Sequence, residues 1–226
     1  MPGVQKVVVF LGPSLPEAEA REILDADYRP PAKRGDLFRA ANDGAEVICL
    51  IDGVFFQDCS VAHKEVLYAL DHGVKVIGAS SMGALRASEL DVYGMEGVGE
   101  IYEAYRRKEL VSDDEVALMF DPYTFEPLSE PLINIRHNLK IAVKEGVLDE
   151  ESHLALLQEA TSLYFPERTY DKIINACKGR VAEGMLERFK TFIDTQRCDL
   201  KKEDAIRAIR RAGELADEAR DLERGY

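Results

Sequence analysis

Three uninterrupted apolar runs in the first half of the chain constrain its fold more than any other feature. They are KVVVFLG (Lys6–Gly12), AEVICLIDG (Ala45–Gly53) and VKVIGA (Val74–Ala79). Apolar residues without polar alternation indicate strands that are covered on both faces. Segments with helical spacing separate the runs, and strands that alternate with helices are joined by parallel crossovers. The sequence therefore predicts an α/β fold in which a parallel-sheet layer forms the N-terminal half.

The second half of the chain has mainly helical periodicity. The predicted helices are Leu132–Lys144, Glu150–Tyr164, Tyr170–Cys177, Val181–Asp194 and Lys201–Leu222. The last is highly charged and has a thin apolar stripe, which is typical of a helix that docks on the body of a protein. A helix that binds a partner is the alternative. We therefore predict an α/β core over residues 1–136 and a helical C-terminal region over residues 137–226.

Charge and cysteine spacing exclude several classes of partner and site. The formal net charge is −13, and an acidic surface repels phosphate backbones, so nucleic acid is not an expected partner. No run approaches the about 18 apolar residues that a membrane span needs. The apolar run near the N-terminus is too short for a signal peptide. Four cysteines without CxxC spacing support neither a zinc site nor a disulfide framework. We expect a cytoplasmic protein without metal or cofactor.

The turn after the third apolar run is the most informative local motif. In Ala79-Ser80-Ser81-Met82-Gly83, small residues flank a serine between a strand and a helix, as in a nucleophile elbow. Ser81 lies at the apex, and Ser80 fits the pattern loosely. The free N–H groups at the start of the following helix suit a developing oxyanion. Such a turn can equally cradle a phosphate or simply pack closely, and the pattern alone leaves all three interpretations open.

A nucleophilic serine needs a base, and none of the four histidines has a motif context. A lysine can serve if its pKa is lowered. Lys64 lies in the first turn of the helix after Asp52-Gly53, where the helix dipole disfavours an ammonium ion. Lys33, on a proline-rich loop, is the competitor, and a solvated surface charge is the alternative for both lysines. Asp52 suits metal binding, orientation of Lys64 or capping of the next turn, of which capping is the simplest.

Seven stretches of the sequence resemble the TfuA-like family. They are FLGPSL (Phe10–Leu15), YRPPAKRGDL (Tyr28–Leu37), LIDGVF (Leu50–Phe55), HKEVLYAL (His63–Leu70), GASSMGALRASEL (Gly78–Leu90), GMEGVGEIYEAY (Gly94–Tyr105) and PLSEPLINIR (Pro127–Arg136). They follow the family's order, and GASSMGALRA is highly specific. The helical C-terminal part has no motif that matches.

The resemblance implies a role in thioamidation beside YcaO enzymes, which activate a peptide amide with ATP so that sulfur can replace its oxygen. It implies that this protein hydrolyses the C-terminal thiocarboxylate of a ThiS-like ubiquitin-fold carrier and so transfers sulfur, as sulfide, to the YcaO enzyme. It also implies help in binding the substrate peptide to YcaO. The family's hydrolase-like site has a Ser–Lys dyad, which we place at Ser81 and Lys64, with Lys33 in reserve.

In the implied mechanism, Lys64 takes the proton of Ser81, which attacks the thioacyl carbon, and sulfide leaves before water clears the acyl-serine. The N–H of Met82 and its neighbours hold the tetrahedral anion. Arg86 pairs with the thiocarboxylate, with a salt bridge to Glu89 as the alternative. Ser80, Asp52 and Lys33 complete the expected substrate-binding residues. A non-catalytic adaptor that bridges YcaO, peptide and carrier is the second hypothesis, and a nucleotide-binding α/β protein is the third.

Overall fold

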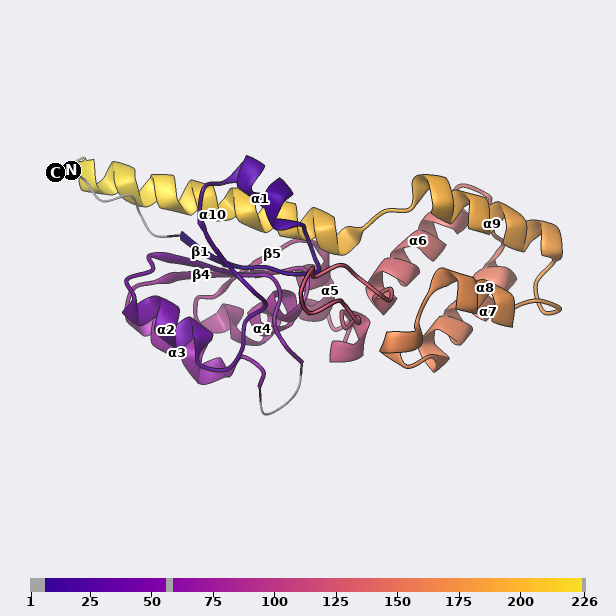
Figure 1. Cartoon of the computed structure of the whole chain (residues 1–226), viewed down its shortest axis with the longest axis horizontal. Helices are drawn as coiled ribbons and strands as arrows, with labels where there is room; N and C mark the ends of the chain where they lie inside the picture. The colour runs from indigo at the N-terminus through magenta and orange to yellow at the C-terminus, as the bar shows by residue number, and fades with distance from the viewer. Residues whose placement is uncertain (1–6, 56–58, 225–226) are drawn as a thin grey trace. The chain divides into compact units, whose positions relative to one another are not determined.

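The chain divides into two compact units in the structure, a computed structural model that describes residues 7–55 and 59–224 (Figure 1). The first unit contains Met1–Asp113 together with Lys201–Tyr226, and the second contains Asp114–Leu200. The sequence placed its boundary at residue 136 and kept the last helix with the helical region. Here that helix belongs to the first unit, because its apolar stripe packs against the sheet.

The first unit is built on a five-stranded sheet in which all neighbouring strands are parallel. The strands are β1 (Val7–Phe10), β2 (Asp27–Arg29), β3 (Val47–Leu50), β4 (Lys75–Ala79) and β5 (Glu96–Val98). Their spatial order is β2-β1-β3-β4-β5. The predicted α/β fold is therefore confirmed. This order is doubly wound and reverses between β1 and β3, which is where such sheets bind ligands beyond the carboxyl ends of their strands.

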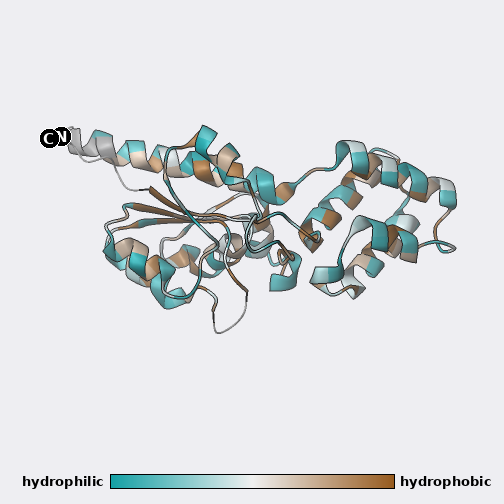
Figure 2. Cartoon of the chain, viewed as in Figure 1, coloured by the Kyte–Doolittle hydropathy of each residue, from teal (hydrophilic) through white to brown (hydrophobic). Residues whose placement is uncertain are grey.

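The three central strands are the three apolar runs of the sequence. Every residue of β1 and β3 is buried, and Ile48 of β3 pairs with Val8 on one side and Val76 on the other. Figure 2 shows these strands as largely hydrophobic segments, whereas the helices mix hydrophobic and hydrophilic residues. The two edge strands, β2 and β5, have three partly exposed residues each and no apolar run.

Helices cover both faces of the sheet (Figure 1). α1 (Glu17–Ile23) and α10 (Leu200–Arg224) lie on one face, and α2 (Asp36–Asn42), α3 (His63–Asp71) and α4 (Met82–Leu90) lie on the other. The helix after β5 is α5 (Glu100–Arg106). Short 3-10 helices occur at Asp91–Tyr93, Asp113–Glu115 and Phe165–Glu167.

The long helix α10 lies against the sheet through a stripe of small and aliphatic side chains. The buried members of this stripe are Ala205, Ala208, Ile209, Ala212, Leu215 and Ala216, which share one core cluster with residues of β1, β3 and β4. Alanines let the helix lie close to the strands, so an unusually charged helix still has a well-buried face. Within the described residues, neither α10 nor any other helix is long and apolar enough to cross a membrane.

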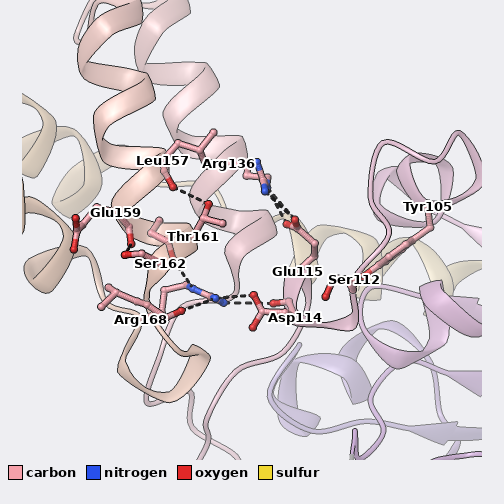
Figure 3. Close-up of polar contacts among 12 residues, drawn as sticks. Tyr105, Ser112, Asp114, Glu115, Arg136, Leu157, Glu159, Thr161, Ser162 and Arg168 are labelled. Atoms are coloured by element: carbon pink, nitrogen blue, oxygen red, sulfur yellow. Dashed lines mark hydrogen bonds and ion pairs between the residues drawn. The ribbon is translucent and has the colours of Figure 1, made fainter.

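The second unit is helical and has a core of its own. Its helices are α6 (Leu132–Lys144), α7 (Glu150–Ser162), α8 (Tyr170–Ala176) and α9 (Glu183–Gln196). The side chain of Arg168 is only 1% exposed; it donates to the carboxylate of Asp114 at 2.7 Å and to two main-chain carbonyls of the α7 end (Figure 3). Arg136 forms a bidentate pair with Glu115 beside it. The buried guanidinium of Arg168 thus connects the end of α7 with the segment at Asp114 and stabilises this unit.

Candidate functional site

The turn between β4 and α4 is strained. The N–H of Ser81 donates to the carbonyl of Ala79 at 2.7 Å, which closes a three-residue turn around Ser80. Ser80 has a φ of 64°, and turns of this kind with a positive central φ are rare and costly. Both serines are buried, with 0% of Ser80 and 2% of Ser81 exposed. The strain therefore lies one residue before the predicted apex.

Two glycines let the start of α4 press directly against the sheet. A Cβ atom at Gly83 would lie 1.7 Å from the carbonyl oxygen of Leu50, and one at Gly78 would lie 2.2 Å from the carbonyl oxygen of Gly83. The N–H of Gly83 also donates to the carbonyl of Ile51 at 3.2 Å. The small residues of the motif thus serve close backbone packing, and this packing fixes where Ser81 stands relative to β3 and β4.

The lysine that contacts Ser81 is Lys201, in the first turn of α10. Its Nζ donates to the Oγ of Ser81 at 3.2 Å, although the two residues lie 120 positions apart in the chain. Lys201 is only 2% exposed. The structure therefore contains a buried Ser–Lys pair whose lysine the sequence did not single out.

The two lysines favoured by the sequence lie elsewhere. Lys64 is exposed in the first turn of α3, because that helix turns Glu65 and Val66 towards the interior. Lys33 is also exposed, on a loop whose neighbour Ala32 bonds to the chain after β3. Within the described part of the chain, no hydrogen bond joins either lysine to Ser81. The structure brings Lys201 to the serine instead.

Asp52, two residues after β3, binds the loop after β1, and this loop in turn binds Ser80. Its carboxylate accepts the N–H groups of Gly12 and Ser14 at 2.9 and 3.0 Å and the hydroxyl of Ser14 at 2.7 Å. Ser80 donates its hydroxyl to the Oγ of Ser14 at 2.9 Å. Asp52 is a capping residue, as in the simplest interpretation, but it caps the loop after β1 rather than the next turn. The network lies at the switch point between β1 and β3.

One main-chain N–H group directly follows Ser81, and a second, at Gly53, lies on the loop that packs against Met82. In the described part of the chain the N–H of Met82, the first residue of α4, has no hydrogen-bond partner. The carbonyl of Asp52 and the N–H of Val54 both bond to Ala32. Because successive peptide groups of an extended chain alternate in direction, the N–H of Gly53 points the other way, towards the β4 side. Gly53 is buried and packs closely on the side chain of Met82.

Arg86 is held by structural partners. Its Nε donates to the carbonyl of Val61 at 2.9 Å, and its Nη1 pairs with Glu89 at 2.6 Å. This is the helix-surface salt bridge that the sequence offered as the alternative to thiocarboxylate binding, and the additional bond to Val61 fixes the approach to α3. Burial raises the pKa of Cys49 in β3 to about 12, so that thiol stays protonated and belongs to the core.

A known protein family matches a segment of the chain that contains part of this site. Residues 52–169 match the TfuA-like protein family, which is just over half of the 226 residues. Ser81, Lys64 and Arg86 lie inside the matched segment, whereas Ser14 and Lys201 lie outside it. No curated protein matches the chain. Because the match extends over more than half of its length, the chain belongs to the TfuA-like protein family.

Proposed function

We propose that this protein releases sulfide from a thiocarboxylated ThiS-like carrier, with Ser81 as nucleophile and Lys201 as base, and supplies it to a YcaO-type enzyme in the cytoplasm. Members of the TfuA-like family have a thioamidation-associated role. The observation that supports the hydrolytic step is the 3.2 Å hydrogen bond between Lys201 and Ser81. A buried amine beside a serine hydroxyl is the arrangement that general-base activation requires.

The chemistry follows from this pair. The neutral amine of Lys201 accepts the hydroxyl proton while Ser81 Oγ bonds to the thioacyl carbon. The tetrahedral intermediate collapses, the C–S bond breaks, and the proton passes from the ammonium group to the departing sulfur. A water molecule, deprotonated by the same amine, then attacks the acyl carbon. The bond from this carbon to Ser81 Oγ breaks, the ammonium group returns its proton to Oγ, and the carrier leaves with a carboxylate. Burial supports this cycle because removal from water disfavours the charged ammonium form.

The oxyanion of the intermediate needs donors that are already in place. The N–H of Met82 follows the nucleophile directly, and the N–H of Gly53 comes from the loop after the neighbouring strand. Serine hydrolases with a strand-to-helix elbow use the same pair of sources. Each such donor is worth about 10²- to 10³-fold in rate. Both therefore support Ser81, rather than Ser80, as the attacking residue.

The test is sulfide release from a thiocarboxylated carrier. We expect Ser81→Ala and Lys201→Met to lower the rate by at least about 10²-fold, since each removes one member of the dyad. Methionine replaces the apolar stem of the buried lysine and lacks only its terminal amine position, so the fold should persist. Lys64→Met and Lys33→Met are matched controls that should retain the wild-type rate. Undiminished release by Ser81→Ala would show that the serine assignment is wrong.

The burial of Ser81 favours one alternative, a non-catalytic adaptor that brings the YcaO enzyme, its peptide and the carrier together. Only 2% of the serine is exposed, so a carrier tail needs an opening to reach it. The two functions differ in a reconstituted thioamidation reaction that contains free sulfide. An adaptor with Ser81→Ala would support thioamidation from the carrier as well as from free sulfide. A hydrolase with the same change would support it from free sulfide alone.

A further inference from the structure

The position of Lys201 depends on how α10 is attached to the rest of the first unit, and one buried carboxylate next to Lys201 adds to the apolar packing of the helix. Asp204 follows Lys201 by three residues and is 0% exposed. Its two carboxylate oxygens accept the N–H groups of Glu100 at 3.0 Å and Ile101 at 2.8 Å. These are the first residues of α5, whose N–H groups have no partner within their own helix. Asp204 thus caps α5 from a different helix.

The main chain before α5 is shaped to receive this carboxylate. Gly99 has a φ of 98°, and a Cβ atom there would lie 2.2 Å from the Cγ and 2.4 Å from each carboxylate oxygen of Asp204. No residue with a side chain fits that position without moving α10. The contact therefore fixes both the rotation of α10 about its axis and its position along it.

Lys201 and Asp204 face the same way. Residues three apart lie on one face of a helix, separated by about 4.5 Å along its axis. Ser81 follows β4, and α5 follows β5, the parallel neighbour of β4. The two contacts of α10, one to Ser81 and one to the start of α5, are therefore made to adjacent chain segments at the same edge of the sheet.

Charged groups of both α10 and α5 lie beside Asp204. Arg207, one turn further along α10, places its Nη1 at 3.2 Å from the carboxylate and at 3.5 Å from Glu100. Burial raises the pKa of Asp204 to about 6, while the N–H groups of Ile101 and Glu100 and the guanidinium of Arg207 oppose the rise. At neutral pH the carboxylate is ionised, so both oxygens accept hydrogen bonds.

We propose that Asp204 is a positioning residue for Lys201: its contact with the start of α5 sets the place on α10 from which the amine reaches Ser81. This inference rests on the proposed hydrolytic function. Small displacements of a reacting group can cost about 10²-fold in rate, so a loosened α10 should slow the chemical step and leave carrier binding intact.

Two variants disturb the contact between α10 and α5, one by changing Asp204 and the other by changing Gly99. Asp204→Asn leaves one acceptor and turns an amide donor towards an N–H group, and Gly99→Ala adds a Cβ where the carboxylate lies. For both we expect kcat for sulfide release to fall at least about tenfold, with KM changed less than about twofold. Lys202→Ala is the control, because it breaks the 2.7 Å surface ion pair of the same helix with Glu19. We expect it to keep the wild-type kcat.

The pH dependence of the wild-type protein provides a second test. As pH falls through about 6, kcat should fall as Asp204 becomes protonated, and the amides of Glu100 and Ile101, which donate to Asp204, should lose protection against hydrogen exchange. Asp204→Asn should lose the component of this fall that titrates near pH 6, and protonation of Lys201 lowers kcat in both proteins alike. If kcat is unchanged in both variants, or if the wild type keeps its rate and exchange protection below pH 6, the positioning role is overturned. Full activity of Ser81→Ala and Lys201→Met would instead overturn the proposed hydrolytic function.

Discussion

The two members of the Ser–Lys pair are held in place by different kinds of contact. Ser81 is positioned by steric fit, because Gly78 and Gly83 bring the start of α4 onto the ends of β3 and β4 without room for one added methyl group. Lys201 is positioned by a helix that lies on the sheet through alanines and is attached through the buried carboxylate of Asp204. The first arrangement is encoded within a few consecutive residues. The second exists only after the chain has folded.

Because Ser81 and Lys201 are held by different contacts, substitutions around them should have different effects. A side chain added at Gly78 or Gly83 would clash with main-chain atoms, and these can move only if α4 or the sheet moves. A change at Asp204 leaves the apolar stripe of α10 in place and alters position and titration instead. The glycine site should therefore have a large effect on stability. The carboxylate site should affect pH dependence and rate more than folding.

Gly83→Ala should have the largest effect on stability. Its Cβ would lie 1.7 Å from the Leu50 carbonyl oxygen, so α4 must move away from the sheet. We expect a loss of at least about 4 kcal/mol in the free energy of unfolding, which is in the range reserved for severe packing errors. Urea denaturation measures it. Gly184→Ala is the matched control, because nothing lies within 4 Å of its Cβ position in α9, and it should be neutral or stabilising by up to about 1 kcal/mol.

The serine side of the site was accessible from the sequence because its determinants are local. Each apolar run predicts one central strand of the sheet. The small residues around Ser81 predict the turn and the start of α4, which are continuous with β4. The edge strands β2 and β5 were not accessible, because they contain three residues each, with charged or glycine residues and no apolar pattern. Their pairing is decided by the neighbouring strands.

The lysine side was missed because Lys201 and Lys202 look alike in the sequence. Lys201 is buried and Lys202 is about one-third exposed. One signal did exist: Lys201 stands four residues before Ala205 and eight before Ile209, which places it on the apolar stripe of a helix that is charged elsewhere. A charged residue on the buried stripe indicates a partner in the core. By contrast, the dipole argument for Lys64 did not account for its free access to water.

The titration of Asp204 makes the stability of the folded protein depend on pH. Its pKa is about 6 in the folded protein against 3.8 as the ordinary value, so the folded state binds more protons between these two values. Stability therefore falls as pH rises through this window, by about 3 kcal/mol at most. Asp204→Asn cannot titrate, and the wild-type free energy of unfolding should fall relative to this variant between pH 4 and 7.

Urea denaturation of both proteins at a series of pH values measures this difference. Stability and activity should move in opposite directions in the wild type, because protonation relieves the buried charge while it loosens the contact with α5. A residue with a purely structural role would move both quantities together. Parallel changes in stability and kcat below pH 6 would therefore contradict the role assigned to Asp204.

Two substitutions of Ser80 distinguish the cost of its positive φ from the contribution of its hydrogen bond, and both should change the free energy of unfolding only slightly. Ser80→Ala removes one buried hydrogen bond, to Ser14, and keeps the positive φ, so it should cost about 1 kcal/mol or slightly more. Ser80→Gly removes the same bond but adopts a φ of 64° without steric cost. The glycine variant should therefore be more stable than the alanine variant by about 1 kcal/mol in urea denaturation. Equal stabilities would show that the turn stores no strain, and the position of Ser81 would then depend on the packing of Gly78 and Gly83 alone.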